Sequence, residues 1–172
     1  MYTIVQPDKT TEYMAQVANN NDKVTIFLAG TIEMGAGIKW HRQVAEQIYH
    51  VLSAKIKDNA KMPKLEFYNP RRTKDFTPEI EIPQIKWEQE HLASADYIFM
   101  YIQPDSKSPI SLLEFGEFIK SGKLYVYCEP AFYRYRNLEL TAAFNQQADH
   151  VLNTTTSAIN KLCDAIASKV NA

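Results

Sequence analysis

The chain has 172 residues, a length that excludes two full catalytic domains and is ample for one hydrophobic core. Apolar residues make up 45% of the chain and charged residues 23%, which excludes a disordered or collagen-like protein. Nineteen basic residues against twenty acidic ones give a net charge of −1, which argues against a surface for nucleic-acid polymers.

Residues 1–21 are predicted to form a polar N-terminal extension, in which residues 2–5 have the pattern of a short edge strand. Residues 22–172 are predicted to form a single domain. Its predicted strands are short runs that are apolar along their whole length, which is typical of strands buried on both faces of a sheet. Five runs have this pattern: residues 23–29, 65–68, 97–102, 124–128 and 150–152.

Apolar side chains at every third or fourth position predict helices between these strands. The predicted helices cover residues 38–56, 85–95, 109–120 and 154–170, while residues 130–147 are rich in aromatic side chains and ambiguous. Gly122 is predicted to end the third of these helices. Strands that alternate with helices predict an α/β fold, a three-layer sandwich around a mostly parallel five-stranded sheet.

In such folds, ligands bind beyond the carboxyl ends of the strands. The loops at that edge are residues 30–37, 69–83, 103–109 and 129–137. Glycine is scarce in the chain, yet Gly30, Gly35 and Gly37 all lie in the first of these loops. Gly35 and Gly37 also fit a plain helix start, because neither a dinucleotide fingerprint nor a phosphate-binding loop accompanies them. We therefore expect the functional site at this edge of the sheet.

The sequence indicates a cytoplasmic protein without metal or cofactor. No run approaches the roughly 18 apolar residues of a membrane span, and the N-terminus lacks the pattern of a signal peptide. Cys128 and Cys163 lie far apart within apolar patterns, which predicts buried thiols and no disulfide. The four histidines (His41, His50, His91 and His150) lack metal-ligand spacing. No cofactor and no membrane partner are expected.

Two glutamates are predicted to face the core. Glu88 lies three residues after Ile85 and four before Leu92, and Glu114 follows Ile110 by four residues. A carboxyl group in an apolar setting has a raised pKa, and such acids are over-represented at functional sites. Two carboxyl groups at one pocket are typical of glycosidic-bond chemistry.

Structural interpretations of these residues stay open at this point. Ser111 stands three residues before Glu114 as in a capping box, and Glu88 near a helix start would stabilise the helix dipole. His41 lies on the apolar stripe of its helix and is predicted to be a core histidine with its hydrogen bonds satisfied, not a base.

Four short segments follow one another along the chain. They are residues 27–32 (Phe-Leu-Ala-Gly-Thr-Ile), residues 68–72 (Tyr-Asn-Pro-Arg-Arg), residues 87–96, which begin Trp-Glu and end Ala-Asp, and Ser108 with residues 113–116 (Leu-Glu-Phe-Gly). Because the four segments occur in this order, the chain resembles the nucleoside 2-deoxyribosyltransferase-like proteins over about residues 23–128. The resemblance implies a flavodoxin-like (Rossmann-like) fold with a five-stranded parallel sheet.

The resemblance also implies an activity. The chain would act on the N-glycosidic bond of (deoxy)nucleosides or nucleotides, transferring the 2-deoxyribosyl group between bases or to water. The family's nucleophile falls on Glu114, and a second acid falls on Glu88, which would move a proton at the departing base or hold the sugar. Gly30 and Gly116 would let the backbone approach the sugar. Substrate-binding positions implied in this way are Phe27, Gly30, Thr31, Asn69, Arg71, Ser108 and Gly116. Asn69, Arg71 and Arg72 would line the base or phosphate side, unless the arginines are merely solvated.

Three positions depart from the family pattern. Ser108 stands where transferases carry Asp; related nucleotide hydrolases have Ser there, which favours a 5′-phosphorylated substrate or a different sugar contact. Glu33, however, stands where those hydrolases carry a phosphate-binding arginine. Phe27 replaces a tyrosine whose hydroxyl reaches the nucleophile in some members, and Tyr68 is one group that would substitute for it.

Two alternatives follow from these departures: an N-glycohydrolase of nucleotides or NAD-type dinucleotides, and a non-catalytic nucleotide-binding module. Family members commonly complete their pocket with a neighbouring subunit, so the resemblance implies a homo-oligomer. Residues 132–136, rich in Tyr and Arg, fit a subunit contact, a base-stacking lid or a covered loop.

Overall fold

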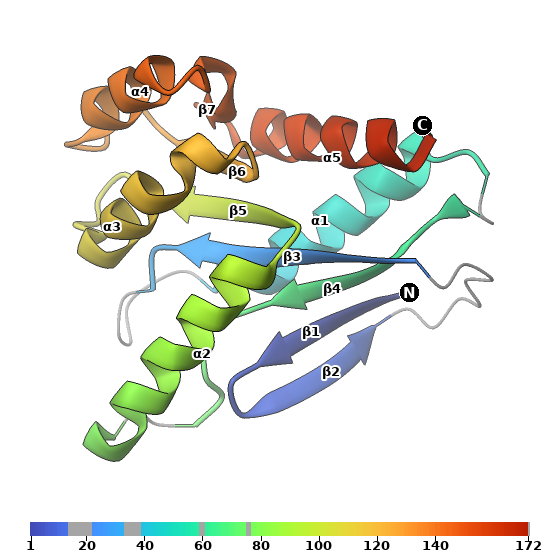
Figure 1. Ribbon diagram of the computed structural model, residues 1–172, viewed down its shortest axis with the longest axis horizontal. Helices are drawn as coiled ribbons and strands as arrows, with labels where there is room; N and C mark the ends of the chain where they lie inside the picture. The colour runs from blue at the N-terminus through green and yellow to red at the C-terminus, as the bar shows by residue number, and fades with distance from the viewer. Residues whose placement is uncertain (14–21, 33–38, 59–60, 75–76, 172) are drawn as a thin grey trace.

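The computed structural model describes residues 1–13, 22–32, 39–58, 61–74 and 77–171 (Figure 1). Within these residues, seven strands form one sheet in the order β2-β1-β4-β3-β5-β6-β7. The strands are β1 (Tyr2–Gln6), β2 (Lys9–Tyr13), β3 (Lys23–Gly30), β4 (Lys64–Tyr68), β5 (Tyr97–Ile102), β6 (Leu124–Cys128) and β7 (Val151–Leu152). The α-helices are α1 (Trp40–Lys55), α2 (Glu81–Ser94), α3 (Pro109–Phe118), α4 (Tyr135–Phe144) and α5 (Thr155–Asn171).

The predicted three-layer α/β sandwich with a mostly parallel sheet is confirmed. The five strands predicted from the sequence are β3, β4, β5, β6 and β7, and all pairs among them are parallel. Numbered along the chain, their spatial order is 2-1-3-4-5, which is the order of flavodoxin-like sheets. The strand order reverses at β3, so a crevice is expected at its carboxyl end.

The predicted number of five strands is wrong, because the N-terminal residues add two more. β1 pairs in parallel with β4, and β2 pairs with β1 in an antiparallel hairpin at the edge of the sheet. Tyr2 and Ile4 are buried there, and the other residues of β1 are only partly covered. Residues 2–5 therefore form a strand as predicted, but β1 lies between β2 and β4, and the edge strand is β2. β2 lacks the continuous apolar pattern that identified the other strands.

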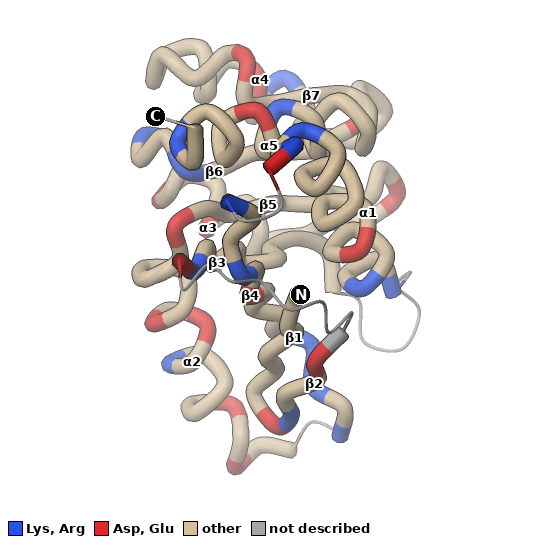
Figure 2. Tube along the Cα trace, turned by 90° about the vertical axis from the view of Figure 1, so that its right-hand side faces the viewer, with Lys and Arg blue, Asp and Glu red and all other residues tan. Residues whose placement is uncertain are grey.

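The helices divide between the two faces of the sheet. On β3, Ile26 and Leu28 point into the core cluster formed with α1 and α5. Phe27 and Ala29 point to the opposite face, into the cluster that includes residues of α2, α3 and α4. Figure 2 shows basic and acidic residues interspersed along the described chain, so neither sign of charge is confined to one part of the fold.

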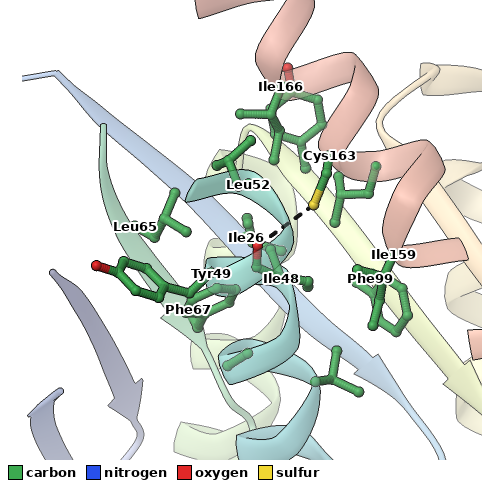
Figure 3. Packing of buried hydrophobic residues seen from close by; sticks show 14 of the residues in the cluster. Ile26, Ile48, Tyr49, Leu52, Leu65, Phe67, Phe99, Ile159, Cys163 and Ile166 are labelled. Carbon is green, nitrogen blue, oxygen red and sulfur yellow. Dashed lines mark hydrogen bonds between the residues drawn. The ribbon is translucent and has the colours of Figure 1, made fainter. Parts of the chain in front are cut away.

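The α1/α5 side is a closely packed core (Figure 3). Ile48 of α1 and Ile159 of α5 lie over the sheet, and the Cys163 thiol donates a weak hydrogen bond to the Ile48 carbonyl, with a sulfur–oxygen distance of 3.7 Å. Cys163 and Cys128 are both free and buried, which confirms the prediction. Burial raises the pKa of each thiol to about 12, so neither is a reactive thiolate at neutral pH.

Helix boundaries differ from the predictions at a few places. α2 begins at Glu81, after a 3₁₀ turn at Pro78–Ile80, and not at residue 85. The ambiguous residues 130–147 contain α4. Gly122 adopts the left-handed conformation (φ 74°) after the 3₁₀ turn that extends α3, so its predicted role as a helix stop is confirmed. Among the described residues, none of the helices has the length and apolar character needed to cross a membrane.

Candidate functional site

A pocket of about 660 Å³ lies at the carboxyl ends of β3 and β4, between α2 and α3. Its lining comes from three of the four predicted loop regions: the end of β3 and the residues after it, residues 70–74 after β4, and the start of α3 from Ser108 onward. From residues 129–137, all of which the structure describes, no side chain lines it. The pocket therefore occupies the crevice expected where the strand order reverses.

Glu114 lines the pocket from α3 and is only 7% exposed. Burial, followed by the negative charges of Glu88 and Glu117, raises the pKa of its carboxyl group to about 8. The inward orientation was predicted, but its expected apolar neighbour Ile110 is 61% exposed at the pocket. Glu114 is buried because α3 packs through Ser111, Glu114 and Phe115 instead.

The capping-box interpretation of Glu114 is wrong. α3 begins at Pro109 with Ser108 as its N-cap residue, so Ser111 lies inside the helix and Glu114 lies beyond the first turn. Ser108 makes no side-chain cap and adopts a left-handed conformation (φ 43°) before the proline. A buried acid in the middle of a short helix has no role in starting that helix.

Glu88 lines the same pocket from α2. Burial raises the pKa of its carboxyl group, and a hydrogen bond from Gln84 works in the opposite direction. Ile85, expected on the same inward stripe, is half exposed. The buried stripe contains Gln84 and Leu92, with Glu88 between them and partly buried. Because α2 begins at Glu81, Glu88 also lies beyond the first turn, where the helix dipole has little effect.

Gln84 was missed by the sequence interpretation, although it connects three parts of the site. Its amide nitrogen donates to the Pro70 carbonyl and to Oε1 of Glu88, both at 2.7 Å. Its amide oxygen accepts a hydrogen bond from Nη1 of Arg72 at 3.2 Å. Its spacing of four residues from Glu88, on a helix face turned to the core, was the signal that would have identified it.

Three hydroxyl groups meet beside the pocket. Oγ of Ser108 lies 2.6 Å from Oγ1 of Thr31 and 2.7 Å from Oγ of Ser106. The backbone N–H of Gln103 donates to the Thr31 hydroxyl, and the Ser106 hydroxyl donates to the backbone carbonyl of Gln103. Ser108 lines the pocket, whereas Thr31 is buried behind it. Ser106 was not predicted.

Gly30 lines the pocket, but its backbone also has a structural reason to be glycine. Its φ is +130°, and a Cβ atom would lie 2.1 Å from the Tyr101 carbonyl oxygen of β5. Apart from its chain neighbours and the backbone of its own helix, no described atom lies within 4 Å of where a Cβ of Gly116 would lie, and Gly116 is not among the described pocket residues. Gly35, Gly37 and Glu33 lie outside the described residues.

Phe27 and Arg71, two of the predicted substrate-binding positions, line the pocket, whereas Asn69 is buried and not among the described pocket residues. The Asn69 side-chain oxygen accepts a hydrogen bond from the Arg71 amide at 3.0 Å, so it shapes the loop. Tyr68, considered as a substitute for the missing tyrosine hydroxyl, is likewise not among the described pocket residues. Burial and a hydrogen bond with Glu66 raise the pKa of Tyr68.

His41 is buried, as predicted, but its hydrogen bonds are not satisfied. Neither ring nitrogen has a hydrogen-bond partner among the residues that the structure describes. Burial, followed by the positive charge of Arg71, lowers the pKa of His41 to about 3. The ring stacks on Trp40 at a centroid distance of 3.8 Å and stays neutral at physiological pH. The prediction of a satisfied core histidine is therefore wrong in its hydrogen bonding.

No group of three or more potential metal ligands occurs within the described ranges. The pocket instead combines two carboxyl groups with hydroxyl groups, apolar side chains and several cations. This set of groups is suited to proton transfer and to stabilising positive charge at a bound ligand.

Comparison with known proteins gives one family. The family model described as "Nucleoside 2-deoxyribosyltransferase like" matches residues 23–132, which include both carboxylic acids and the whole described pocket lining. A crystal structure of a conserved protein from Enterococcus faecalis is similar with a TM-score of 0.42 and 14% sequence identity, covering 86% of this chain and 97% of that one. No curated protein matches the chain.

Proposed function

Because the chain belongs to the nucleoside 2-deoxyribosyltransferase-like family, we propose that it breaks the N-glycosidic bond of (deoxy)nucleosides or nucleotides and transfers the 2-deoxyribosyl group. Glu114 acts as the nucleophile and Glu88 assists proton transfer at the base. The acceptor is a second base or water. The single observation that carries this proposal is that Glu114, a buried acid with a raised pKa, shares one pocket with Glu88.

The pair of acids supplies the two protonation states that the reaction needs. With a pKa of about 8, Glu114 retains its proton at neutral pH in the free protein. The mutual repulsion of two carboxylates at one site favours a single shared proton. That proton is available to the departing base, and its transfer leaves a carboxylate to meet the developing positive charge on the sugar.

In the first displacement, the Glu114 carboxylate attacks the anomeric carbon and the carbon–nitrogen bond breaks. The bonding electron pair leaves with the base, which takes up the proton, directly or through Glu88. A covalent glycosyl ester to Glu114 results. Phe27 and Ile32 provide apolar surface beside this centre, and Ser108 provides a hydroxyl group for the sugar.

In the second displacement, a base nitrogen or a water molecule attacks the same carbon and releases Glu114. The incoming group loses a proton, which returns to the acid pair. Two displacements at one carbon retain its configuration. When a base is the acceptor, the product is a new nucleoside. When water is the acceptor, the product is the free sugar.

The decisive experiment is a panel of ribo- and deoxynucleosides and their 5′-monophosphates, assayed for released base. Glu114→Ala and Glu114→Gln are expected to abolish release, because both remove the carboxylate. Glu90→Gln is the matched control, since Glu90 is an exposed acid of α2 that is not among the described pocket residues. Turnover that survives Glu114→Ala would overturn the assignment of the nucleophile.

A second free base added to the same assay distinguishes transfer to a base from hydrolysis. Formation of a new nucleoside identifies a transferase, and free sugar alone identifies an N-glycohydrolase. Binding of nucleosides by calorimetry without turnover across the panel would instead identify a non-catalytic nucleotide-binding module.

The proposal includes a homo-oligomer, as in the family. Leu113 on α3, next to Glu114, is 66% exposed, and its neighbour Ile110 lines the pocket. A second copy packed here would cover these side chains and close the pocket to water. In residues 132–136, all of which the structure describes, Phe132 is buried while Tyr133 is exposed and donates to the Lys107 carbonyl, and none of these residues is part of the pocket lining.

A further inference from the structure

Four cations line one part of the pocket. Arg71, Arg72 and Lys74 come from the loop after β4, and Lys39 precedes α1. Within the part of the chain that the structure describes, no acid lies within ion-pairing distance of any of them. Lysines elsewhere do form such pairs, as Lys55 does with Asp164 at 2.6 Å. Among the described residues, the cations of the pocket therefore have no ion pair to explain them.

The two arginines have hydrogen-bond donors without acceptors. Nη1 of Arg71 and Nε of Arg72 are buried, and neither has a partner among the described residues. A buried N–H group without an acceptor is costly, so it indicates an acceptor supplied from outside the chain. The planar fork of a guanidinium group matches the oxygens of a phosphate group.

The loop that carries these cations is held from behind. The Asp8 carboxylate, in the turn between β1 and β2, accepts hydrogen bonds from the Thr73 and Lys74 amides at 3.1 Å. The Gln6 side chain donates to the Arg71 carbonyl. These contacts engage the backbone of the loop and the Thr73 side chain, and they leave Nη1 of Arg71 and Nε of Arg72 without an acceptor among the described residues.

The cations and the acids are two parts of one connected site. Arg72 donates to Gln84, and Gln84 donates to Glu88, which lies in the same pocket as Glu114. A ligand whose sugar lies at the acids therefore has the basic loop next to it. The mixture of signs in the pocket suits a substrate that is anionic at one end and becomes cationic at the reacting carbon.

We propose that the substrate is a nucleoside 5′-monophosphate, whose phosphate group is bound by Arg71, Arg72 and Lys74, with Lys39 at the rim. This inference rests on the proposed function for the position of the sugar. The same cations would attract the pyrophosphate of a dinucleotide, so the experiment compares both sources of phosphate.

The test measures binding by calorimetry to the full-length Glu114→Gln variant, which keeps the ligands intact. The ligands are the four common 2′-deoxynucleosides, their 5′-monophosphates and NAD. For at least one base, the monophosphate is expected to bind at least about ten times more tightly than the nucleoside. Adding Arg71→Gln or Arg72→Gln is expected to reduce the affinity for the monophosphate to that of the same variant for the nucleoside.

Arg136→Gln is the matched control, because Arg136 is an exposed arginine of α4 that is not among the described pocket residues; it leaves all affinities unchanged. Lys74→Gln, at an exposed position, replaces the arginine variants if their circular dichroism shows unfolding. Equal affinity for nucleoside and monophosphate, or tighter binding of NAD than of any monophosphate, overturns the inference. Tight monophosphate binding without base release by the wild type supports the phosphate site and overturns only the proposed function.

Discussion

Glu114 links the chemistry of the site to the stability of the protein. Its carboxyl group is buried beside a second acid, so the ionised form is unfavourable in the folded state. The raised pKa follows from where the side chain lies, and a residue with such a pKa in a pocket is suited to acid–base and nucleophilic work near neutral pH. The same property has a measurable effect on folding.

The stability of the wild type is expected to fall as the pH rises from about 4.5 to about 8. The ordinary pKa of 4.5 applies to the unfolded chain and about 8 to the folded one, so in this range the folded state holds a proton that the unfolded state has released. In Glu114→Gln this loss is absent, which makes the variant more stable than the wild type at pH 8.5 by about 1–3 kcal/mol. Urea unfolding at pH 4.5 and 8.5 measures it; identical pH profiles would contradict the raised pKa.

Glu88→Gln is expected to lower the pKa of Glu114, since it removes a negative charge from the same pocket. The pH at which the stability of the protein declines then moves downward with that pKa. The control is Glu90→Gln, an exposed acid on the same helix that should leave the profile unchanged. An unshifted profile in Glu88→Gln would show that the two acids do not interact.

Gly30→Ala is expected to lower the free energy of unfolding by at least about 2 kcal/mol, because the new Cβ meets the β5 backbone and the φ of +130° is strained for alanine. Gly116→Ala serves as the control: it adds a methyl group where there is space in a helix, and its effect is expected to be neutral or stabilising by up to about 1 kcal/mol. Thermal and urea unfolding distinguish the two. Equal effects would contradict the close approach of β3 to β5.

At the scale of secondary-structure elements, the β1–β2 hairpin supports the site from outside it. The hairpin extends the sheet next to β4 and also holds the loop that follows β4. Burial alone would raise the pKa of Asp8, but the amides of Thr73 and Lys74, the Thr73 hydroxyl and the charge of Arg72 lower it. The carboxylate form of Asp8 is therefore the one that binds the loop.

Asp8→Ala is expected to increase hydrogen exchange at the Thr73 and Lys74 amides, since both lose their acceptor. The wild-type protection should weaken in the same way as the pH falls through the lowered pKa of Asp8. Glu12→Ala, on the exposed side of the same hairpin, is the control and leaves both amides as they are. Unchanged exchange in Asp8→Ala would mean that other contacts hold the loop.

At the scale of the whole molecule, the flavodoxin-like strand order explains why one pocket collects residues from distant parts of the chain. The reversal at β3 brings the loop after β4 and the start of α3 to opposite sides of the β3 carboxyl end. The exposed apolar side chains of α3 lie at the rim of this crevice. The proposed assembly should therefore depend on that helix.

Leu113→Glu is expected to shift the protein from an oligomer to a monomer in sedimentation velocity, because a charge would be buried in the proposed contact. Phe144→Glu is the control; Phe144 is 88% exposed on α4 and should leave the assembly intact. A monomeric wild type, or dissociation by Phe144→Glu alone, would overturn the proposed contact surface.

The amino-acid sequence by itself determined five strands, the alternation with helices and the two inward-facing acids. These properties are encoded locally, since a strand buried on both faces is apolar throughout and a helix repeats every 3.6 residues. Even there the neighbours were partly wrong: Ile85 and Ile110 are exposed, because periodicity does not reveal which part of a helix face reaches the sheet.

Only the tertiary structure decided that β2 joins the sheet and that β1 lies next to β4, that Gln84 bridges Arg72 to Glu88, and that cations without an ion pair among the described residues lie in the pocket of the acids. Each depends on contacts between residues far apart in sequence, or on a side chain's environment, and neither leaves a periodic pattern. The physical reason is that pairing and burial are set by packing across the whole sheet, whereas the pattern along the chain reports only how each segment divides its own polar and apolar faces.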